Sequence, residues 1–123
     1  MILVKEKYLE LINTPSDMNY HLRTLYEYAK KCDHVTEFGV RNGVSTMAFL
    51  SACPKRLVSY DLLYDVVVGE AFKEAREMGF DYDYKIENIL ETEIEETDLL
   101  FIDTFHSEIQ LDKELNLHSG NVR

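Results

Sequence analysis

Two short stretches of this chain place chemically useful side chains beside an expected turn. The first, residues 37–46, reads Glu-Phe-Gly-Val-Arg-Asn-Gly-Val-Ser-Thr. Glycines at 39 and 43 let the backbone turn tightly and approach a ligand without a Cβ clash. A helix that begins after Gly43 offers unpaired N–H groups and the positive end of its dipole. Glu37 can accept hydrogen bonds from a ligand ammonium or hydroxyl group. A tight turn that holds no ligand is the alternative interpretation.

The second stretch is Val58-Ser59-Tyr60-Asp61, in which the acid closes an apolar run. Asp61 follows the glycine turn at roughly the 20-residue spacing at which an acid meets a ribose, and a carboxylate can bind both ribose hydroxyls. An acid in this place can equally cap the following helix. The first stretch lacks the third glycine of the G-x-G-x-x-G dinucleotide fingerprint, so the pair of signals disfavours NAD.

The elements that must position these residues alternate along the chain. The N-terminal part predicts a helix over 2–13 and a second helix that Ser16 or Asp17 caps and Asp33-His34 ends. Beyond it, short apolar runs predict strands over 35–40, 57–60, 80–86 and 99–102. Helical spacing, with Gly79 and Gly120 near two of the helix ends, predicts helices over 43–52, 66–78 and 108–117.

This alternation predicts an α/β fold with a parallel sheet of about four strands, covered by helices on both faces. We expect one domain over 1–123, in which 1–32 form N-terminal helices and 33–117 form the core. Ligands of such sheets bind beyond the carboxyl ends of the strands. Both chemical stretches lie at such ends.

Composition excludes several classes of protein. The chain has 23 acidic against 13 basic residues, a net charge of −10, so nucleic acid is disfavoured as a partner. No apolar run approaches the roughly 20 residues that a membrane helix needs, and no signal peptide is evident. We therefore expect no membrane partner and a cytoplasmic location. Cys32 and Cys53 have the spacing of neither a zinc site nor a disulfide framework. The acidic run 91–96 is interpreted as a solvated loop.

The chain resembles class I (Rossmann-like) S-adenosylmethionine-dependent methyltransferases. It is most similar to the branch whose first motif reads E-x-G-x-x-x-G-x-S-T and whose fourth strand reads F-I-D-x-x-H-S. Residues 37–46 supply the first motif and residues 98–107, Asp-Leu-Leu-Phe-Ile-Asp-Thr-Phe-His-Ser, supply the second. The resemblance covers roughly positions 33–117. It implies a Rossmann-like three-layer sandwich that is incomplete relative to the seven-stranded family fold.

The resemblance also implies which residues meet the cofactor, S-adenosylmethionine. The backbone from Gly39 to Gly43, including Asn42, lies against its methionine part, and Glu37 lies near its amino group. Asp61 holds the ribose and Asn88 recognises the adenine edge. The resemblance adds Ser45, from the same motif, to the cofactor-binding residues.

Two further residues fall, by the resemblance, where the sulfonium methyl group meets its acceptor. His106 can act as a general base near neutral pH, and Asp103 can hold the acceptor or a divalent cation, although no metal site is indicated. The alternative for His106 is a polar residue at a helix start that hydrogen-bonds to Glu108 or to the backbone. The implied reaction is methyl transfer to an oxygen or nitrogen of a small molecule or sugar.

The fifth to seventh strands of the family fold have no counterpart in this sequence. We expect a domain truncated after the fourth strand, with cofactor binding retained and catalysis in doubt. A module that binds the nucleoside or a partner chain without methylating anything is the second hypothesis, and a generic nucleotide-binding domain is the third. The apolar strand 99–102 then forms an unprotected edge, which predicts a homo-oligomer.

Overall fold

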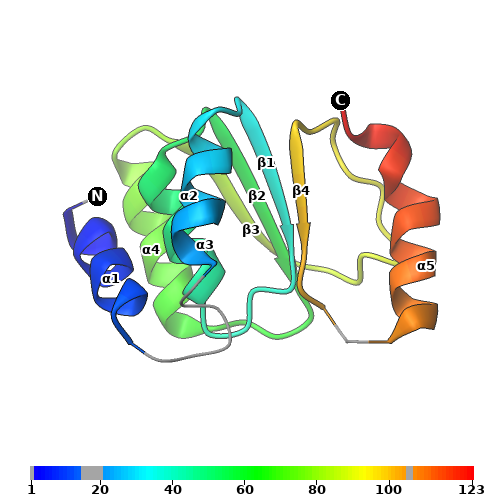
Figure 1. The fold of residues 1–123 in the computed structure, drawn as a ribbon, viewed down its shortest axis with the longest axis horizontal. Coiled ribbons are helices and arrows are strands. Elements are labelled where there is room, and N and C mark those ends of the chain that lie inside the picture. Colours follow the sequence, from blue (N-terminus) through cyan, green and yellow to red (C-terminus); the bar gives the residue numbers. More distant parts are fainter. Residues whose placement is uncertain (1, 15–20, 105–106) are drawn as a thin grey trace.

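The computed structural model describes residues 2–14, 21–104 and 107–123 (Figure 1). Its strands form one parallel sheet with the order β3-β2-β1-β4. They are β1 (His34–Phe38), β2 (Arg56–Asp61), β3 (Asp81–Ile86) and β4 (Leu99–Ile102). All four predicted strands are confirmed, with bounds that differ by a residue or two.

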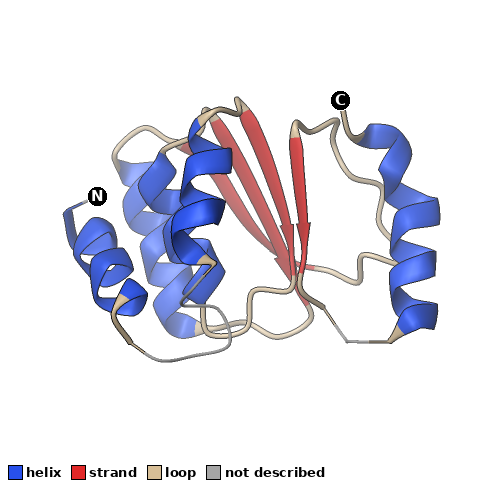
Figure 2. Cartoon of the chain, in the orientation of Figure 1, coloured by secondary structure: helices blue, strands red, loops and turns tan. Residues whose placement is uncertain are grey.

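Helices cover both faces of the sheet, so the expected three-layer α/β architecture is confirmed (Figure 2). They are α1 (Ile2–Ile12), α2 (Leu22–Lys30), α3 (Val44–Ala52), α4 (Val66–Glu77) and α5 (Glu108–His118), which runs into a 3₁₀ turn, Ser119–Asn121. Helices α1 to α4 lie on one side of the sheet and α5 stands on the other (Figure 1). Among the described helices, none has both the length and the apolar character needed to cross a membrane.

Side-chain caps fix two of the helix starts. Asp65 accepts a hydrogen bond from the Val68 N–H (3.0 Å) at the start of α4, and Ser107 accepts one from the Gln110 N–H (3.0 Å) at the start of α5. Both satisfy an N–H group that the first helical turn leaves unpaired. Helix α2 begins after His21, and the candidate caps Ser16 and Asp17 lie outside the described residues.

The expectation that Asp33-His34 ends the second helix is wrong for His34. Helix α2 ends at Lys30, and His34 opens β1, in register with Arg56 of β2. The His34 carbonyl accepts a hydrogen bond from the Asp98 N–H (3.0 Å), beside β4. Pairing on both sides holds this residue in an extended conformation, which the local sequence did not reveal.

The sheet has a separate apolar core on each face. On the α1–α4 side the core takes Val35, Leu57 and Tyr82 from the strands and packs them against all four helices. On the other side, Phe38, Val58 and Tyr60 pack against Ile89 and Ile94. These last two residues belong to the segment 87–98, which crosses this face from β3 to β4 without a helix.

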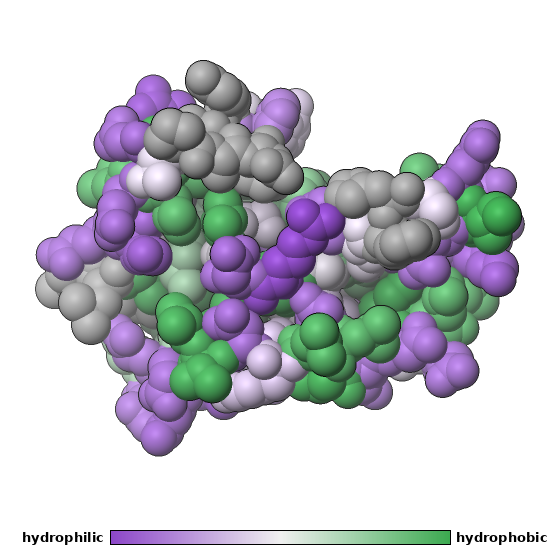
Figure 3. Space-filling view, turned by 90° about the horizontal axis from the view of Figure 1, so that it is seen from below, coloured by the Kyte–Doolittle hydropathy of each residue, from purple (hydrophilic) through white to green (hydrophobic). Residues whose placement is uncertain are grey.

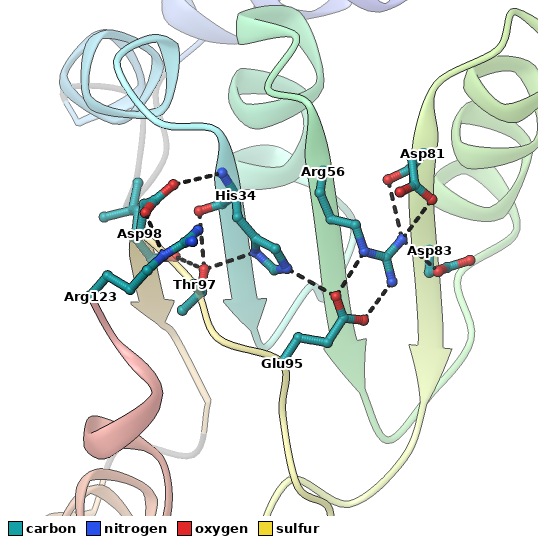
Figure 4. Close-up of polar contacts among 9 residues, drawn as sticks. His34, Arg56, Asp81, Asp83, Glu95, Thr97, Asp98 and Arg123 are labelled. Carbon is teal, nitrogen blue, oxygen red and sulfur yellow. Dashed lines mark hydrogen bonds and ion pairs between the residues drawn. The ribbon is translucent and has the colours of Figure 1, made fainter.

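A charged network ties that crossing segment to the amino ends of the strands (Figure 4). Arg56 binds both carboxylate oxygens of Glu95 (2.9 and 2.6 Å) and also pairs with Asp81 and Asp83. Nε2 of His34 lies 3.1 Å from Glu95. Glu95 keeps 44% of its side chain exposed, as the interpretation of 91–96 as a solvated loop expects, and the Arg56 hydrogen bonds hold its pKa low, at about 2. That interpretation is wrong at Ile94, which is buried.

The C-terminal residues are bound at the same end of the sheet. Thr97 forms a parallel bridge with Val122, on the side of β4 away from β1. Arg123 Nε lies 2.8 Å from an Asp98 carboxylate oxygen. The amino end of the predicted open edge is thus paired within the chain.

Candidate functional site

The carboxyl ends of β1, β2 and β4 converge on one pocket of about 430 Å³. Two backbone hydrogen bonds hold its floor together: the Gly39 N–H donates to the Tyr60 carbonyl (2.9 Å) and the Asp103 N–H to the Phe38 carbonyl (2.8 Å). The pocket is lined by Gly39, Arg41, Tyr60, Asp61, Leu62, Glu87, Asn88, Ile89, Leu90, Asp103, Thr104 and Gln110. Of the nine predicted site residues, Gly39, Asp61, Asn88 and Asp103 meet here.

The glycine turn between β1 and α3 has the conformation that its sequence predicted. Gly39 and Gly43 have φ of +85° and +87°, and Arg41 between them also has a positive φ, 54°. A Cβ at Gly39 would overlap the carbonyl of Asp103, and a Cβ at Gly43 would meet the Val68 side chain. The space that the glycines leave is filled by the protein's own β4 end and α4. Of the two, only Gly39 lines the pocket, and Asn42 does not.

Glu37 lies behind this turn and is fully buried. Its carboxylate accepts hydrogen bonds from the hydroxyls of Ser45 (2.5 Å), Thr46 (2.7 Å) and Ser59 (2.9 Å). Burial raises the pKa of Glu37 to about 7, the three hydroxyls oppose that rise, and the charge of Asp103 adds to it. Glu37 and Ser45 therefore bind each other beneath the turn, and neither lines the pocket.

Asp61 fastens the end of β2 to the glycine turn. Its Oδ2 accepts hydrogen bonds from the N–H groups of Val40 and Arg41, both at 2.8 Å. Its Oδ1 accepts from Leu62 (2.6 Å) and, at the long distance of 3.4 Å, from Leu63. The acid caps backbone groups rather than the helix α4, which Asp65 caps. Asp61 lines the pocket, and its Oδ1 accepts only one short hydrogen bond whereas Oδ2 accepts two.

Asn88 and Glu87 form the far side of the pocket, just after β3. Oδ1 of Asn88 accepts a hydrogen bond from the Leu90 N–H (3.0 Å), which fixes the orientation of the side-chain amide. An oriented amide therefore lines the same pocket as Asp61.

Asp103 follows β4 and lies opposite Arg41, whose guanidinium Nη2 is 3.8 Å from Oδ1 of Asp103. The other predicted catalytic residue, His106, lies outside the described residues. Among the described residues, no three metal-binding side chains come together.

Two residues that the sequence did not single out bind each other on the β4 side of the pocket. Thr104 lines it, and its hydroxyl lies 2.7 and 2.8 Å from the two carboxylate oxygens of Glu114 on α5. Glu114 is fully buried. The sequence pattern does not reveal that Glu114 is buried. A helix normally buries its apolar residues, but in α5 apolar residues such as Ile109 and Leu117 are exposed.

The electrostatic character of the pocket is acidic. Asp61, Glu87 and Asp103 face it together with one cation, Arg41. A pocket with more carboxylates than cations favours a ligand that carries positive charge near them. Arg41 and Glu87 were also missed by the sequence analysis.

Solved structures that superpose on this chain include several methyltransferases. An S-adenosylhomocysteine-bound methyltransferase from Podospora anserina superposes with a TM-score of 0.67 at 16% identity, over 98% of this chain and 57% of that one. A putative caffeoyl-CoA O-methyltransferase from Staphylococcus aureus gives 0.65 at 17% identity, over 99% and 61%. The N-methyltransferase NodS from Bradyrhizobium japonicum gives 0.64 at 16% identity, over 85% and 60%.

The chain has the fold of class I S-adenosylmethionine-dependent methyltransferases. It spans about 60% of the length of these methyltransferase structures. No family model matches the sequence, and no curated protein matches it significantly. At 16–17% identity, the likeness to these structures shows the fold and agrees with the resemblance carried by residues 37–46 and 98–107.

Proposed function

We propose that this chain binds S-adenosylmethionine in the pocket at the carboxyl ends of β1, β2 and β4 and transfers its methyl group to a small molecule. The observation that carries the proposal is the meeting of Gly39, Asp61, Asn88 and Asp103 around one pocket in a methyltransferase fold. The volume of about 430 Å³ lies in the range of small-molecule sites.

The residues present fit this cofactor chemically. A sulfonium ion and an ammonium group are cationic, and the pocket has three carboxylates against one guanidinium. Oδ1 of Asp61 has one short and one long N–H contact, so a ribose hydroxyl can replace the long one from Leu63. The amide of Asn88 offers both a donor and an acceptor to a base edge.

When bound, the cofactor supplies an electrophilic methyl group on positively charged sulfur. Asp103 faces the pocket beside the Gly39 turn, where its carboxylate can orient an acceptor O–H or N–H and take its proton. His106, outside the described residues, is proposed to share this role as a general base near neutral pH. The residues otherwise act by aligning the acceptor, which lowers the entropic cost of the reaction.

Calorimetric titration tests the proposal. S-adenosylmethionine and S-adenosylhomocysteine should bind with dissociation constants in the micromolar range, and NAD should bind at least about 30-fold more weakly, because the pocket lacks a third glycine for its pyrophosphate. Equal binding of NAD, or no binding of either adenosyl compound, would contradict it.

A second measurement separates binding from chemistry. His106→Ala should leave the dissociation constant for S-adenosylmethionine almost unchanged. With a methyl acceptor identified by screening, the variant should transfer the methyl group about 100-fold more slowly. Binding without transfer to any acceptor would leave the chain a binding module.

A further inference from the structure

The turn that joins β2 to α4 and the first two residues of α4 carry an exposed apolar surface. Five large apolar residues lie in the six positions 62–67, and each is 60–80% exposed. We call this set the 62–67 patch; its members are Leu62, Leu63, Tyr64, Val66 and Val67. Figure 3 looks onto this pole of the molecule and shows hydrophobic side chains gathered in groups along one edge.

The 62–67 patch is contiguous in the sequence and large for a single exposed apolar surface. Five such side chains at this exposure present on the order of 500 Å² of apolar surface, comparable with the largest patch on a typical monomer, which is often functional. A standard interface takes about 800 Å² from each partner. The patch therefore supplies more than half of the area that a stable association needs.

Tyr84 binds the backbone of the turn and one ring of the patch. The Tyr84 hydroxyl donates to the Leu63 carbonyl (3.2 Å) and accepts from the Asp65 N–H (2.9 Å). The rings of Tyr64 and Tyr84 stack with centroids 5.4 Å apart, and the Tyr64 ring occupies the space beside Gly69 that a Cβ would fill. A preordered surface loses little conformational freedom on binding, which favours association.

Charge indicates which partner fits. The chain carries −10, which disfavours docking on an anionic lipid surface or nucleic acid. Within 62–67 the only ionisable acid, Asp65, is occupied as the cap of α4. Two acidic copies meet with least repulsion where each presents a neutral apolar face. Homodimer interfaces are more apolar than the rest of a protein surface, and tyrosine is enriched in them.

We propose that the 62–67 patch is the surface through which two copies of this chain form a two-fold dimer. Leu62 belongs both to the patch and to the pocket lining, so the partner copy lies at the pocket rim. The proposal goes beyond methyl transfer and does not depend on it. It places the homo-oligomer contact at the β2–α4 turn instead of the β4 edge, whose amino end Val122 already pairs.

Sedimentation velocity over a concentration series tests the dimer. The unmodified chain should dimerise with a dissociation constant of the order of 10 µM. Added salt should strengthen association, because it screens the repulsion between two acidic copies. Leu63→Ser/Val67→Ser should raise the dissociation constant at least tenfold while thermal unfolding shows that the fold is kept. A monomer at all concentrations would overturn the proposal.

Matched controls remove equally exposed apolar side chains elsewhere. Leu9→Ser on α1 and Ile109→Ser on α5, at 58% and 71% exposure, should leave the dimer intact. Equal loss in these controls would mean non-specific hydrophobic association and would overturn the proposal. Loss in Val122→Ser, with the patch variant still dimeric, would move the contact to the β4 edge and overturn it too.

Discussion

Gly39 lies directly against the backbone carbonyl of Asp103, so closely that no Cβ fits between them. This contact joins the end of β1 to the end of β4 at the floor of the pocket. The two residues come from the two motifs that the sequence analysis singled out. Their proximity explains why the first of these motifs needs a glycine there, independently of any ligand.

Three glycine-to-alanine variants separate the cost of a left-handed backbone from the cost of a steric overlap with the added Cβ. Gly39→Ala should lower the free energy of unfolding by about 3 kcal/mol or more, because it combines a left-handed backbone with a steric overlap. Gly79 has φ +94° with open space around it, so Gly79→Ala should cost only about 1 kcal/mol. Gly120→Ala, without either problem, should change stability by less than about 0.5 kcal/mol. Urea unfolding measures all three, and equal losses at 39 and 79 would refute the steric argument.

Asp61→Ala should weaken S-adenosylmethionine binding by roughly 2 kcal/mol, or about 30-fold, because the ribose hydroxyls lose a charged acceptor. The variant also frees the N–H groups of Val40 and Arg41, so its folding must be checked by circular dichroism. Glu91→Ala, which removes an exposed acid that does not line the pocket, is the matched control for charge and should bind normally. An unchanged dissociation constant in folded Asp61→Ala would remove Asp61 from the site.

The buried Glu37 makes stability depend on pH. Its pKa is about 7 in the folded chain, above the ordinary glutamate value of 4.5, so the folded state holds a proton that the unfolded state has released between these pH values. The free energy of unfolding should therefore fall as pH rises from about 4.5 to 7, by up to about 3 kcal/mol for this group. Glu37→Gln should flatten this slope, whereas exposed Glu70→Gln should not. Parallel pH profiles for the two variants would contradict the assignment.

Thr104→Val should lower the free energy of unfolding by about 2 to 3 kcal/mol, because it removes a hydroxyl that binds the fully buried carboxylate of Glu114. Thr104→Ser keeps the hydroxyl and should cost less than about 1 kcal/mol. The comparison by urea unfolding isolates the hydrogen bond from the loss of methyl contacts. Similar losses in both variants would mean that packing, not the hydroxyl, matters here.

Much of the fold could be predicted from local pattern. Short apolar runs and helical spacing specified all four strands and the helices between them, since burial on both faces demands such runs in a parallel sheet. The boundary at His34 could not be predicted, because its strand conformation depends on pairing with Arg56 and on the carbonyl contact from beside β4. The ion pair of Glu95 could not be predicted either, because its partner Arg56 lies 39 residues away in the sequence.

For the candidate site, the sequence by itself determined the glycine turn and the acids at the strand ends, because backbone conformation and strand termini leave a local signature. Only the tertiary structure decided what each of these side chains faces. It turned Glu37 and Ser45 toward each other beneath the turn, gave Asp61 four backbone donors, and brought Thr104 against Glu114 of α5. Such contacts depend on which strands become neighbours and on which face of a helix is covered, and no short stretch of sequence contains that information.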